Sequence, residues 1–324
     1  MQKFKFITHD NTDAYFNLAS EEYLLKHTDD YYIYLWVNDR AVIVGTNQNA
    51  IEEVNLAYTE KAGVKVVRRL TGGGTVYHDK GNLCYTIIAP YNVDEDNYKK
   101  FTAPVIEYLK SLGVNASFSG RNDIVIDDKK ISGNAQTVFE NRIMHHGTIL
   151  FNADTEELSK CLNPSKIKMQ SKGIKSVRAR ITNVIEHLPR KMTIVEFKSG
   201  LKEQFLKDCD LYEFTDEDKA EIQKLVDEKY SKYEWNIGRS PIGQNEFSAK
   251  FDFGIFTLRF NTENGLISDA EIFGDFFEKK SVKGLAKELN GIKFNKTDVE
   301  KALEKVNEFI HGANANQIAY KMFE

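Results

Sequence analysis

Two adjacent arginines, Arg68 and Arg69, stand shortly before a run of three glycines, Gly72, Gly73 and Gly74. Glycine has no Cβ and tolerates positive φ, so such a run lets main-chain N–H groups converge on an anion. Arginine side chains bind phosphate or carboxylate oxygens through paired N–H groups. The segment therefore predicts an anion-binding loop, and the alternative is a glycine-rich hairpin with solvated arginines. P-loop and Rossmann folds are disfavoured, because the glycines follow neither G-x-x-x-x-G-K-[ST] nor G-x-G-x-x-G.

A second group of polar residues surrounds an expected β-hairpin. Asn122 and Asp123 precede an apolar run that ends at an Asp127-Asp128 turn, and Lys130 lies on the return strand. The pattern of an apolar run, a turn and a second strand is typical of a hairpin. Lys130 is thereby a candidate for contact with a ligand as a point charge, and the alternative is a solvated strand lysine.

Two further segments carry charge or titratable groups. His145 and His146 open a strand, and neighbouring side chains on a strand point to opposite faces, so one zinc ion shared by both is disfavoured. The basic stretch 165–180 contains no acidic residue, which suggests a loop that closes over an anionic ligand. The alternative is a solvated surface that faces nucleic acid, but the stretch holds no aromatic residue for stacking on bases.

The periodicity of apolar residues predicts an α+β protein of two domains, 1–244 and 245–324, joined by a linker over 233–243. Helices are expected over residues 17–26, 96–112 and 215–230. A further helix is expected to begin at a capping box at 297–300 and to carry Leu303, Val306 and Ile310. Strands are expected over residues 32–37 and 41–44, paired across an Asn38-Asp39 turn, and over 64–68, 83–88, 124–126, 144–151, 246–260 and 266–273.

The composition is that of a cytoplasmic enzyme. The chain has 324 residues, 41% of them hydrophobic and 28% charged, with a formal net charge of -4. No run approaches the roughly 18 apolar residues of a membrane span, and the N-terminus has no apolar secretion signal. Three scattered cysteines, Cys84, Cys161 and Cys209, suit a reducing compartment. Neither a membrane nor a nucleic acid is expected as a partner.

Taken together, these motifs resemble the lipoate–protein ligase A family of the biotin/lipoate ligase superfamily. They occur in the family's order and span about the first 185 residues. The matching segments are Phe16–Glu22, Arg68–Asn82, Gly120–Asp123, Lys130–Gly133, His145–Thr148 and Lys172–Arg180.

The resemblance implies the fold and the reaction. The fold is a large mixed-sheet catalytic domain with a small C-terminal α+β accessory domain. The reaction is activation of lipoate by ATP, with Mg²⁺, to lipoyl-AMP and pyrophosphate, and then transfer of the lipoyl group to a lysine. The implied acceptors are the lipoyl domains of 2-oxoacid dehydrogenase E2 subunits and the glycine-cleavage H protein.

The resemblance also implies roles for individual residues, with Lys130 as the catalytic residue that touches both the lipoyl carbonyl and the α-phosphate. The ATP and adenylate site comprises Arg69, Gly74, Thr75, Val76, Tyr77, Asn122, Asp123 and Lys130, with Asp123 also expected at Mg²⁺. The lipoate site comprises Lys130, Gly72, Gly73, His78, His146 and Gly147, and Leu18, Trp36, Val44, Val76 and His78 are candidates for its apolar slot. The loop over the adenylate contains Lys172, Gly173, Ser176, Val177 and Arg178.

Two alternatives to the ligase stay open. One is an octanoyl or lipoyl transferase of the same fold that acts through a cysteine thioester, with Cys84 or Cys161 as the thiol. The other is a non-catalytic protein that binds lipoate. Arg69, the segment 172–180 and the C-terminal domain favour the ligase over the transferase. Lys130, Arg69 and the three glycines argue against a protein that only binds lipoate.

Overall fold

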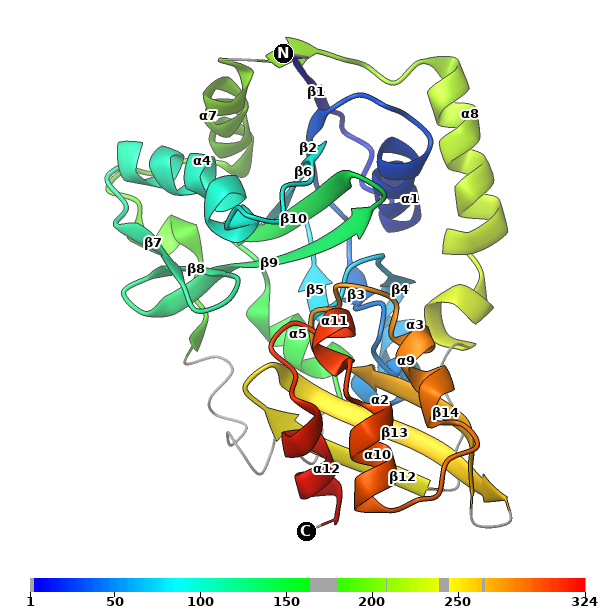
Figure 1. Cartoon of the computed structure of the whole chain (residues 1–324). Helices are drawn as coiled ribbons and strands as arrows, with labels where there is room; N and C mark the ends of the chain where they lie inside the picture. Colours follow the sequence, from blue (N-terminus) through cyan, green and yellow to red (C-terminus); the bar gives the residue numbers. More distant parts are fainter. Residues whose placement is uncertain (1–2, 164–179, 208, 239–244, 264–265, 324) are drawn as a thin grey trace.

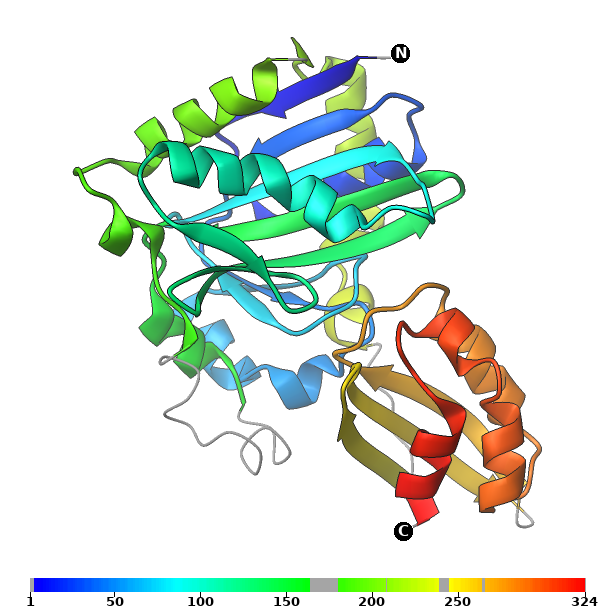
Figure 2. The same cartoon turned by 60° about the vertical axis from the view of Figure 1, so that its left-hand side comes forward.

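The computed structural model describes residues 3–163, 180–207, 209–238, 245–263 and 266–323. Figure 1 and Figure 2 show a larger body that holds the N-terminus and a smaller body that holds the C-terminus. Each body combines helices with a sheet, which confirms the expected α+β fold class. The predicted boundary at residue 244 lies outside the described residues and stays a prediction, as does the cytoplasmic location.

Within the described residues, the strands form one eight-stranded sheet and two three-stranded sheets. The large sheet has the order β11-β1-β2-β6-β10-β9-β8-β7, and the small sheets have the orders β4-β3-β5 and β12-β13-β14. The strands are β1 (Phe4–Thr8), β2 (Tyr32–Trp36), β3 (Ala41–Val44), β4 (Lys65–Arg68), β5 (Val76–His78), β6 (Asn82–Pro90), β7 (Ala116–Ser119), β8 (Asp123–Ile126), β9 (Lys129–Phe139), β10 (Arg142–Leu150), β11 (Cys209–Leu211), β12 (Asn245–Phe251), β13 (Gly254–Glu263) and β14 (Leu266–Gly274).

Helices cover both faces of the large sheet. The helices of the larger body are α1 (Ala14–Lys26), α2 (Ala50–Glu53), α3 (Leu56–Ala62), α4 (Asn97–Ser111), α5 (Thr155–Cys161), η3 (Val184–His187), α7 (Ile194–Leu206), α8 (Asp216–Leu225), η4 (Val226–Tyr230) and η5 (Glu234–Gly238). Those of the smaller body are α9 (Val282–Leu289), α10 (Lys296–Ala302), α11 (Val306–Phe309) and α12 (Ala315–Phe323). None of the described helices is long and apolar enough to cross a membrane.

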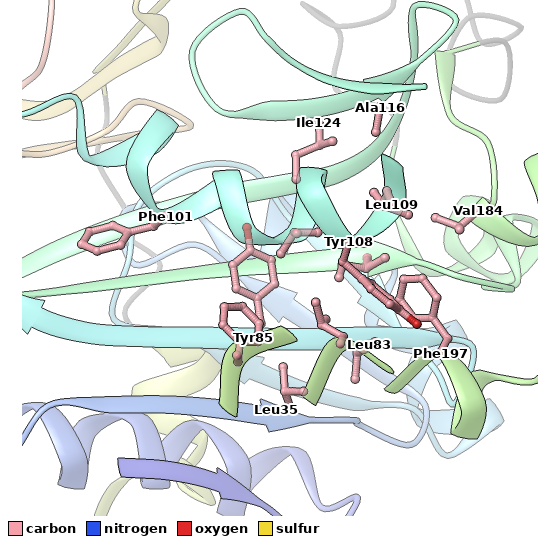
Figure 3. Packing of buried hydrophobic residues seen from close by; sticks show 14 of the residues in the cluster. Leu35, Leu83, Tyr85, Phe101, Tyr108, Leu109, Ala116, Ile124, Val184 and Phe197 are labelled. Atoms are coloured by element: carbon pink, nitrogen blue, oxygen red, sulfur yellow. The ribbon is translucent and has the colours of Figure 1, made fainter. Parts of the chain in front are cut away.

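The core lies in two layers on either side of the large sheet. On one face, Leu83 and Tyr85 of β6 pack against Leu109 of α4 and Phe197 of α7 (Figure 3). On the other face, α1 packs against alternate residues of the same strands, among them Cys84 of β6, and α8 packs beside α1. The smaller body has its own core between the sheet β12–β14 and helices α9 to α12.

Local sequence signals account for several elements. The β8–β9 hairpin turns at Asp127 and Asp128, whose φ values of 49° and 61° are tolerated by Asp better than by most residues. Helix α4 begins after Asp96, whose side chain accepts the N–H of Lys99, and ends just before Gly113 at φ +83°. Both elements were predicted, and both are confirmed.

The predicted hairpin of residues 32–37 with 41–44 is wrong. Strand β2 pairs with β1 and β6 in the large sheet, whereas β3 pairs with β4 and β5 in a separate sheet. The connection does not form a solvated turn, because Asn38 is fully buried and its side chain bonds to Asn17 and His78. The chain therefore crosses between two sheets at this point.

Three predictions for the C-terminal part also need correction. The strand expected over 246–260 is two strands, β12 and β13, which turn before Gly254 at φ +128°. Helix α10 begins earlier than the predicted capping box, because the Asn295 side chain accepts the N–H of Asp298. The helix expected to continue to Ile310 breaks after Ala302 and resumes as α11.

Part of the predicted linker is a docked segment held by Arg68. The Arg68 guanidinium donates to five carbonyl oxygens, at 2.6–3.2 Å, of Gly45, Thr46, Gln48, Trp235 and Asn236. The side chain is fully buried, so it is not the solvated or anion-binding group that the sequence suggested. Arg68 instead fixes η5 against β3 and β4.

We expect Arg68→Lys to lower the free energy of unfolding by about 2–4 kcal/mol, because a lysine can replace few of the five hydrogen bonds. Urea unfolding followed by tryptophan fluorescence measures this, since Trp235 is bonded to Arg68 through its carbonyl and its Nε1–H. The control is Arg40→Lys at a half-exposed ion pair, which should change stability by less than about 1 kcal/mol. Equal effects of the two substitutions would contradict the buried role of Arg68.

Candidate functional site

A cavity of about 180 Å³ lies between the glycine segment, strands β9 and β10, and helix α1. The structure brings most of the predicted site residues to it. Those that line it are Arg69, Gly73, Gly74, Thr75, Val76, His78, Asn122, Lys130, His146 and Gly147, with Leu18 and Trp36 from the predicted apolar slot. Residues that line it without having been predicted are Ile43, Gly133, Asn134, Ala135, Thr148 and Phe277, and it also reaches Cys84.

Four predicted residues do not line the cavity. The Tyr77 and Val44 side chains pack in a different cluster, next to Val42 and Val54, so Val44 is not part of an apolar slot. Asp123 forms an ion pair with Lys130, and Gly72 lies close to the carbonyl of Phe276. The five predicted loop residues, Lys172, Gly173, Ser176, Val177 and Arg178, lie outside the described residues.

The lining joins an apolar region to a charged hairpin. Leu18, Trp36, Ile43 and Cys84 belong to one packed cluster that Val76 borders. Lys130 and Asn122 come instead from the β8–β9 hairpin and its approach. A ligand with an apolar chain and an anionic head group matches this combination, because the chain is removed from water and the head group meets an ammonium.

Lys130 is placed by its neighbours on both sides. Its ammonium lies 2.7 Å from Asp123 Oδ1, and both side chains are about one-third exposed. A Cβ on Gly133 would come within 2.8 Å of Lys130 Nζ, so glycine leaves the room that the ammonium occupies. The Lys130 carbonyl accepts the N–H of Thr182 at 3.0 Å, which pairs this strand with the chain that follows the basic stretch. No local pattern in the sequence indicated that pairing.

Asn122 and Asn134 fix each other beside Lys130. The Asn122 amide donates to the Asn134 carbonyl at 2.6 Å, and the Asn134 main-chain and side-chain N–H groups both donate to the Asn122 carbonyl at 2.9 Å. Tyr85 donates to Asn134 Oδ1 at 2.5 Å. The pair therefore orders the wall of the cavity, and Asn134 belongs to the site although it was not among the predicted residues.

Arg69 is buried and bound to the protein's own oxygens. Its guanidinium donates to Gly72 and Gly74 carbonyls at 2.6 and 2.8 Å, to the Ile43 carbonyl at 3.2 Å and to Thr71 Oγ1 at 2.9 Å. Burial lowers the pKa of Arg69 to about 10, so the group is still charged at neutral pH. In this structure Arg69 holds the glycine segment and forms part of the cavity lining.

His78 and His146 line the cavity, and His78 is a neutral imidazole. Burial, with contributions from Arg69 and His146, lowers the pKa of His78 to about 3. The Asn38 amide donates to His78 Nδ1 at 3.1 Å, which leaves the hydrogen on Nε2. His145 faces the opposite side of the sheet from His146 and packs against Tyr98 and Tyr85, which confirms that the pair points in opposite directions.

The smaller body supplies part of the cavity wall through Phe277. Its ring lies against Arg121, whose guanidinium carbon is 5.1 Å from the ring centroid, and against Tyr98 at 5.9 Å between centroids. The adjacent Phe276 carbonyl accepts the Gly73 N–H at 3.2 Å. No local pattern in the sequence could link Phe277 to a glycine run so far away along the chain.

The contact with Phe276 explains why glycines occupy positions 72 and 73, an explanation that the sequence did not suggest. Gly73 has φ +88°, and a Cβ on Gly72 would lie 2.7 Å from the Phe276 carbonyl oxygen. The run therefore admits the main chain of the smaller body at close range, in addition to shaping the cavity.

Comparisons with known proteins agree with this geometry. Residues 13–206 match the family model of the lipoyl protein ligase A/B catalytic domain, and residues 240–320 match that of the bacterial lipoate protein ligase C-terminus. The chain is 42% identical to lipoate-protein ligase LplJ of Bacillus subtilis over 311 residues, 93% of this chain and 94% of LplJ. The chain belongs to the lipoate–protein ligase family.

Solved structures support the same assignment. The crystal structure of P. falciparum LipL1 in complex with lipoate superposes with a TM-score of 0.82, at 29% identity, over 99% of this chain and 100% of LipL1. A crystal structure of lipoate-protein ligase A bound with ATP superposes with a TM-score of 0.63, at 26% identity, over 73% of this chain and 98% of that one. The first covers both bodies of the present structure.

We expect Gly72→Ala to loosen the contact between the two bodies, because its Cβ would meet the Phe276 carbonyl, an overpacking that costs about 1–3 kcal/mol. Hydrogen exchange of residues 273–278 measures the contact and should become faster. The matched control is Gly74→Ala, since a Cβ at Gly74 meets no atom within 4 Å. The close-approach explanation fails if both variants exchange at the same rate as the parent.

Proposed function

We propose that this protein is an ATP-dependent lipoate–protein ligase that works in two steps. In the first, a lipoate carboxylate oxygen attacks the α-phosphorus of ATP and pyrophosphate leaves, which gives lipoyl-AMP. In the second, the amine of an acceptor lysine attacks the lipoyl carbonyl carbon, and AMP leaves with the bridging oxygen. A free carboxylate is a poor acyl donor, so the first step supplies the leaving group that the second requires.

One observation carries the proposal: a cavity in a member of this family joins an apolar cluster to the ammonium of Lys130. The apolar cluster accommodates the hydrocarbon tail of lipoate, and Lys130 attracts its carboxylate. Attack of that carboxylate on ATP brings two anions together, so a positive charge at the meeting point stabilises the transition state more than the separated reactants.

We assign the other predicted residues to the two ligands as follows. Gly74, Thr75 and Val76, with the main chain of Tyr77 next to them, hold the adenylate, and Arg69 supports that loop with its positive charge. Asn122 contacts the nucleotide from the hairpin. Gly73, His78, His146 and Gly147 shape the lipoate site, with neutral His78 suited to an apolar tail, and Gly72 supports that site from outside the lining.

Magnesium and the acceptor belong to the same proposal. Mg²⁺ bound to ATP phosphates needs only one or two protein carboxylates, and Asp123 beside Lys130 fits that need through water. The proposed acceptors are lipoyl domains of E2 subunits and the glycine-cleavage H protein.

A thioester mechanism has little support in the geometry. Cys161 is fully buried away from the cavity, and burial raises the pKa of its thiol to about 11. Cys84 reaches the cavity, but it is buried in β6 and its pKa is well above the ordinary value for the same reason. Because the thiolate is the nucleophilic form, neither residue is prepared for acyl transfer.

The proposal is tested by incubating the full chain with ATP, Mg²⁺ and lipoate in the absence of an acceptor. Lipoyl-AMP and pyrophosphate should form in equal amounts; the pyrophosphate should be released, and the lipoyl-AMP should stay bound until a lipoyl domain is added. A transferase would release no pyrophosphate, and a protein that only binds lipoate would leave ATP intact; either result would overturn the proposal.

Lys130→Ala should lower the rate of pyrophosphate release at least about a hundredfold, because it removes the charge at the point where carboxylate and α-phosphate meet. Stopped assays of pyrophosphate with saturating ATP and lipoate measure the loss. Lys129→Ala, at the exposed neighbouring position, serves as the control and should keep the parent rate. Near-parental release by Lys130→Ala would remove Lys130 from the mechanism.

A further inference from the structure

A continuous chain of buried side chains runs from helix α1 to the glycine segment. His146 Nδ1 lies 2.9 and 3.1 Å from the two carboxylate oxygens of Glu21, and His146 Nε2 lies 2.8 Å from Thr71 Oγ1. Arg69 Nε donates to the same Thr71 oxygen at 2.9 Å. All four side chains are buried, so leaving any of their polar atoms without a partner is costly.

The hydrogen bonds of the four groups link Arg69 to Glu21. Arginine can only donate, so Thr71 Oγ1 accepts from Arg69, and the Thr71 hydroxyl donates to His146 Nε2 in the tautomer of His146 that carries its hydrogen on Nδ1. His146 then carries its hydrogen on Nδ1 and donates it to Glu21. Glu21 is thus the final acceptor, and it also receives the hydroxyl hydrogen of Thr86 at 2.6 Å.

At the other end of this series of hydrogen bonds, Arg69 sets the conformation of the glycine segment. Arg69 Nη2 donates to the carbonyls of Gly72 and Gly74, and the described residues contain no cis peptide bond. In a trans peptide, C=O and N–H point in opposite directions. The N–H groups of Gly73 and Thr75 therefore point away from Arg69, and that of Gly73 meets the Phe276 carbonyl.

We propose that Glu21 is a positioning residue for the glycine segment 72–75, acting through His146, Thr71 and Arg69. Glu21 does not line the cavity, so its effect on a ligand must pass through these neighbours. Without its acceptor, the His146 ring loses the partner that fixes its tautomer, and Thr71 loses the direction of its hydroxyl. Arg69 is then free to release the glycine carbonyls. The expected effect on ATP rests on the proposed function, whereas the effect on the segment itself does not.

The neighbouring Glu22 provides a matched control. It is also buried on α1, but its carboxylate is bound by Lys26, Lys229 and Tyr230, away from the glycine segment. Truncation of either glutamate removes a buried, bonded carboxylate, so both variants should be less stable than the parent. Only Glu21 leads to Arg69.

The test compares hydrogen exchange of residues 72–76 in the ligand-free full chain with steady-state kinetics on the same samples. Glu21→Ala should speed exchange of the segment about tenfold and raise the KM for ATP by a similar factor, as expected for one lost hydrogen bond. Glu21→Gln should stay within about threefold of the parent, because its amide oxygen still accepts from His146. Glu22→Ala should lower the melting temperature and leave both quantities unchanged.

A second pair of variants covers the case in which Glu21→Ala fails to fold. Thr71→Val interrupts the series of hydrogen bonds without changing the side-chain volume, whereas Thr71→Ser keeps the hydroxyl. Only the valine variant should therefore speed hydrogen exchange of residues 72–76. Parental exchange in a folded Glu21→Ala or Thr71→Val variant overturns the proposal, as does a Glu21→Gln variant as impaired as Glu21→Ala. If the parent makes no lipoyl-AMP, the proposed function fails, while the exchange data still test the positioning role.

Discussion

The buried guanidinium of Arg69 is the interaction on which the cavity depends. A charge removed from water must be bound by polar groups, and this one is bound by three carbonyl oxygens and a hydroxyl. Two of those carbonyls belong to the glycine segment, so satisfying the charge also fixes the segment. The positions of residues 73–76, which line this side of the cavity, therefore depend on how Arg69 is bound.

The same segment connects the two bodies of the molecule. With Gly72 and Gly74 carbonyls turned toward Arg69, the Gly73 N–H is turned outward to Phe276, and Phe277 reaches the cavity beside it. Because residues of both bodies line the cavity, a movement of one body relative to the other would open or close it. In a ligase this matters, because a mixed anhydride must be kept from water and later be presented to an acceptor lysine.

Local patterns in the sequence predicted elements whose partners are close along the chain. The β8–β9 hairpin is set by Asp127 and Asp128, and α4 by Asp96 and Gly113. The pairing of β2 with β3 was predicted wrongly. Both strands are buried apolar runs, and no local sequence pattern indicates which sheet each strand joins. The motifs located most of the cavity, but the burial of Arg68 and the arrival of Phe277 depend on packing between distant segments.

In the proposed reaction, the carboxylate of lipoate is activated as an acyl adenylate in this cavity. The decisive experiment lipoylates a lipoyl domain with ATP and with lipoate labelled with ¹⁸O in both carboxylate oxygens. Mass spectrometry of the released AMP should show one ¹⁸O atom for each lipoyl group transferred, because the bridging oxygen leaves with AMP. Unlabelled AMP, or label found in inorganic phosphate with ADP as the other product, would contradict the account.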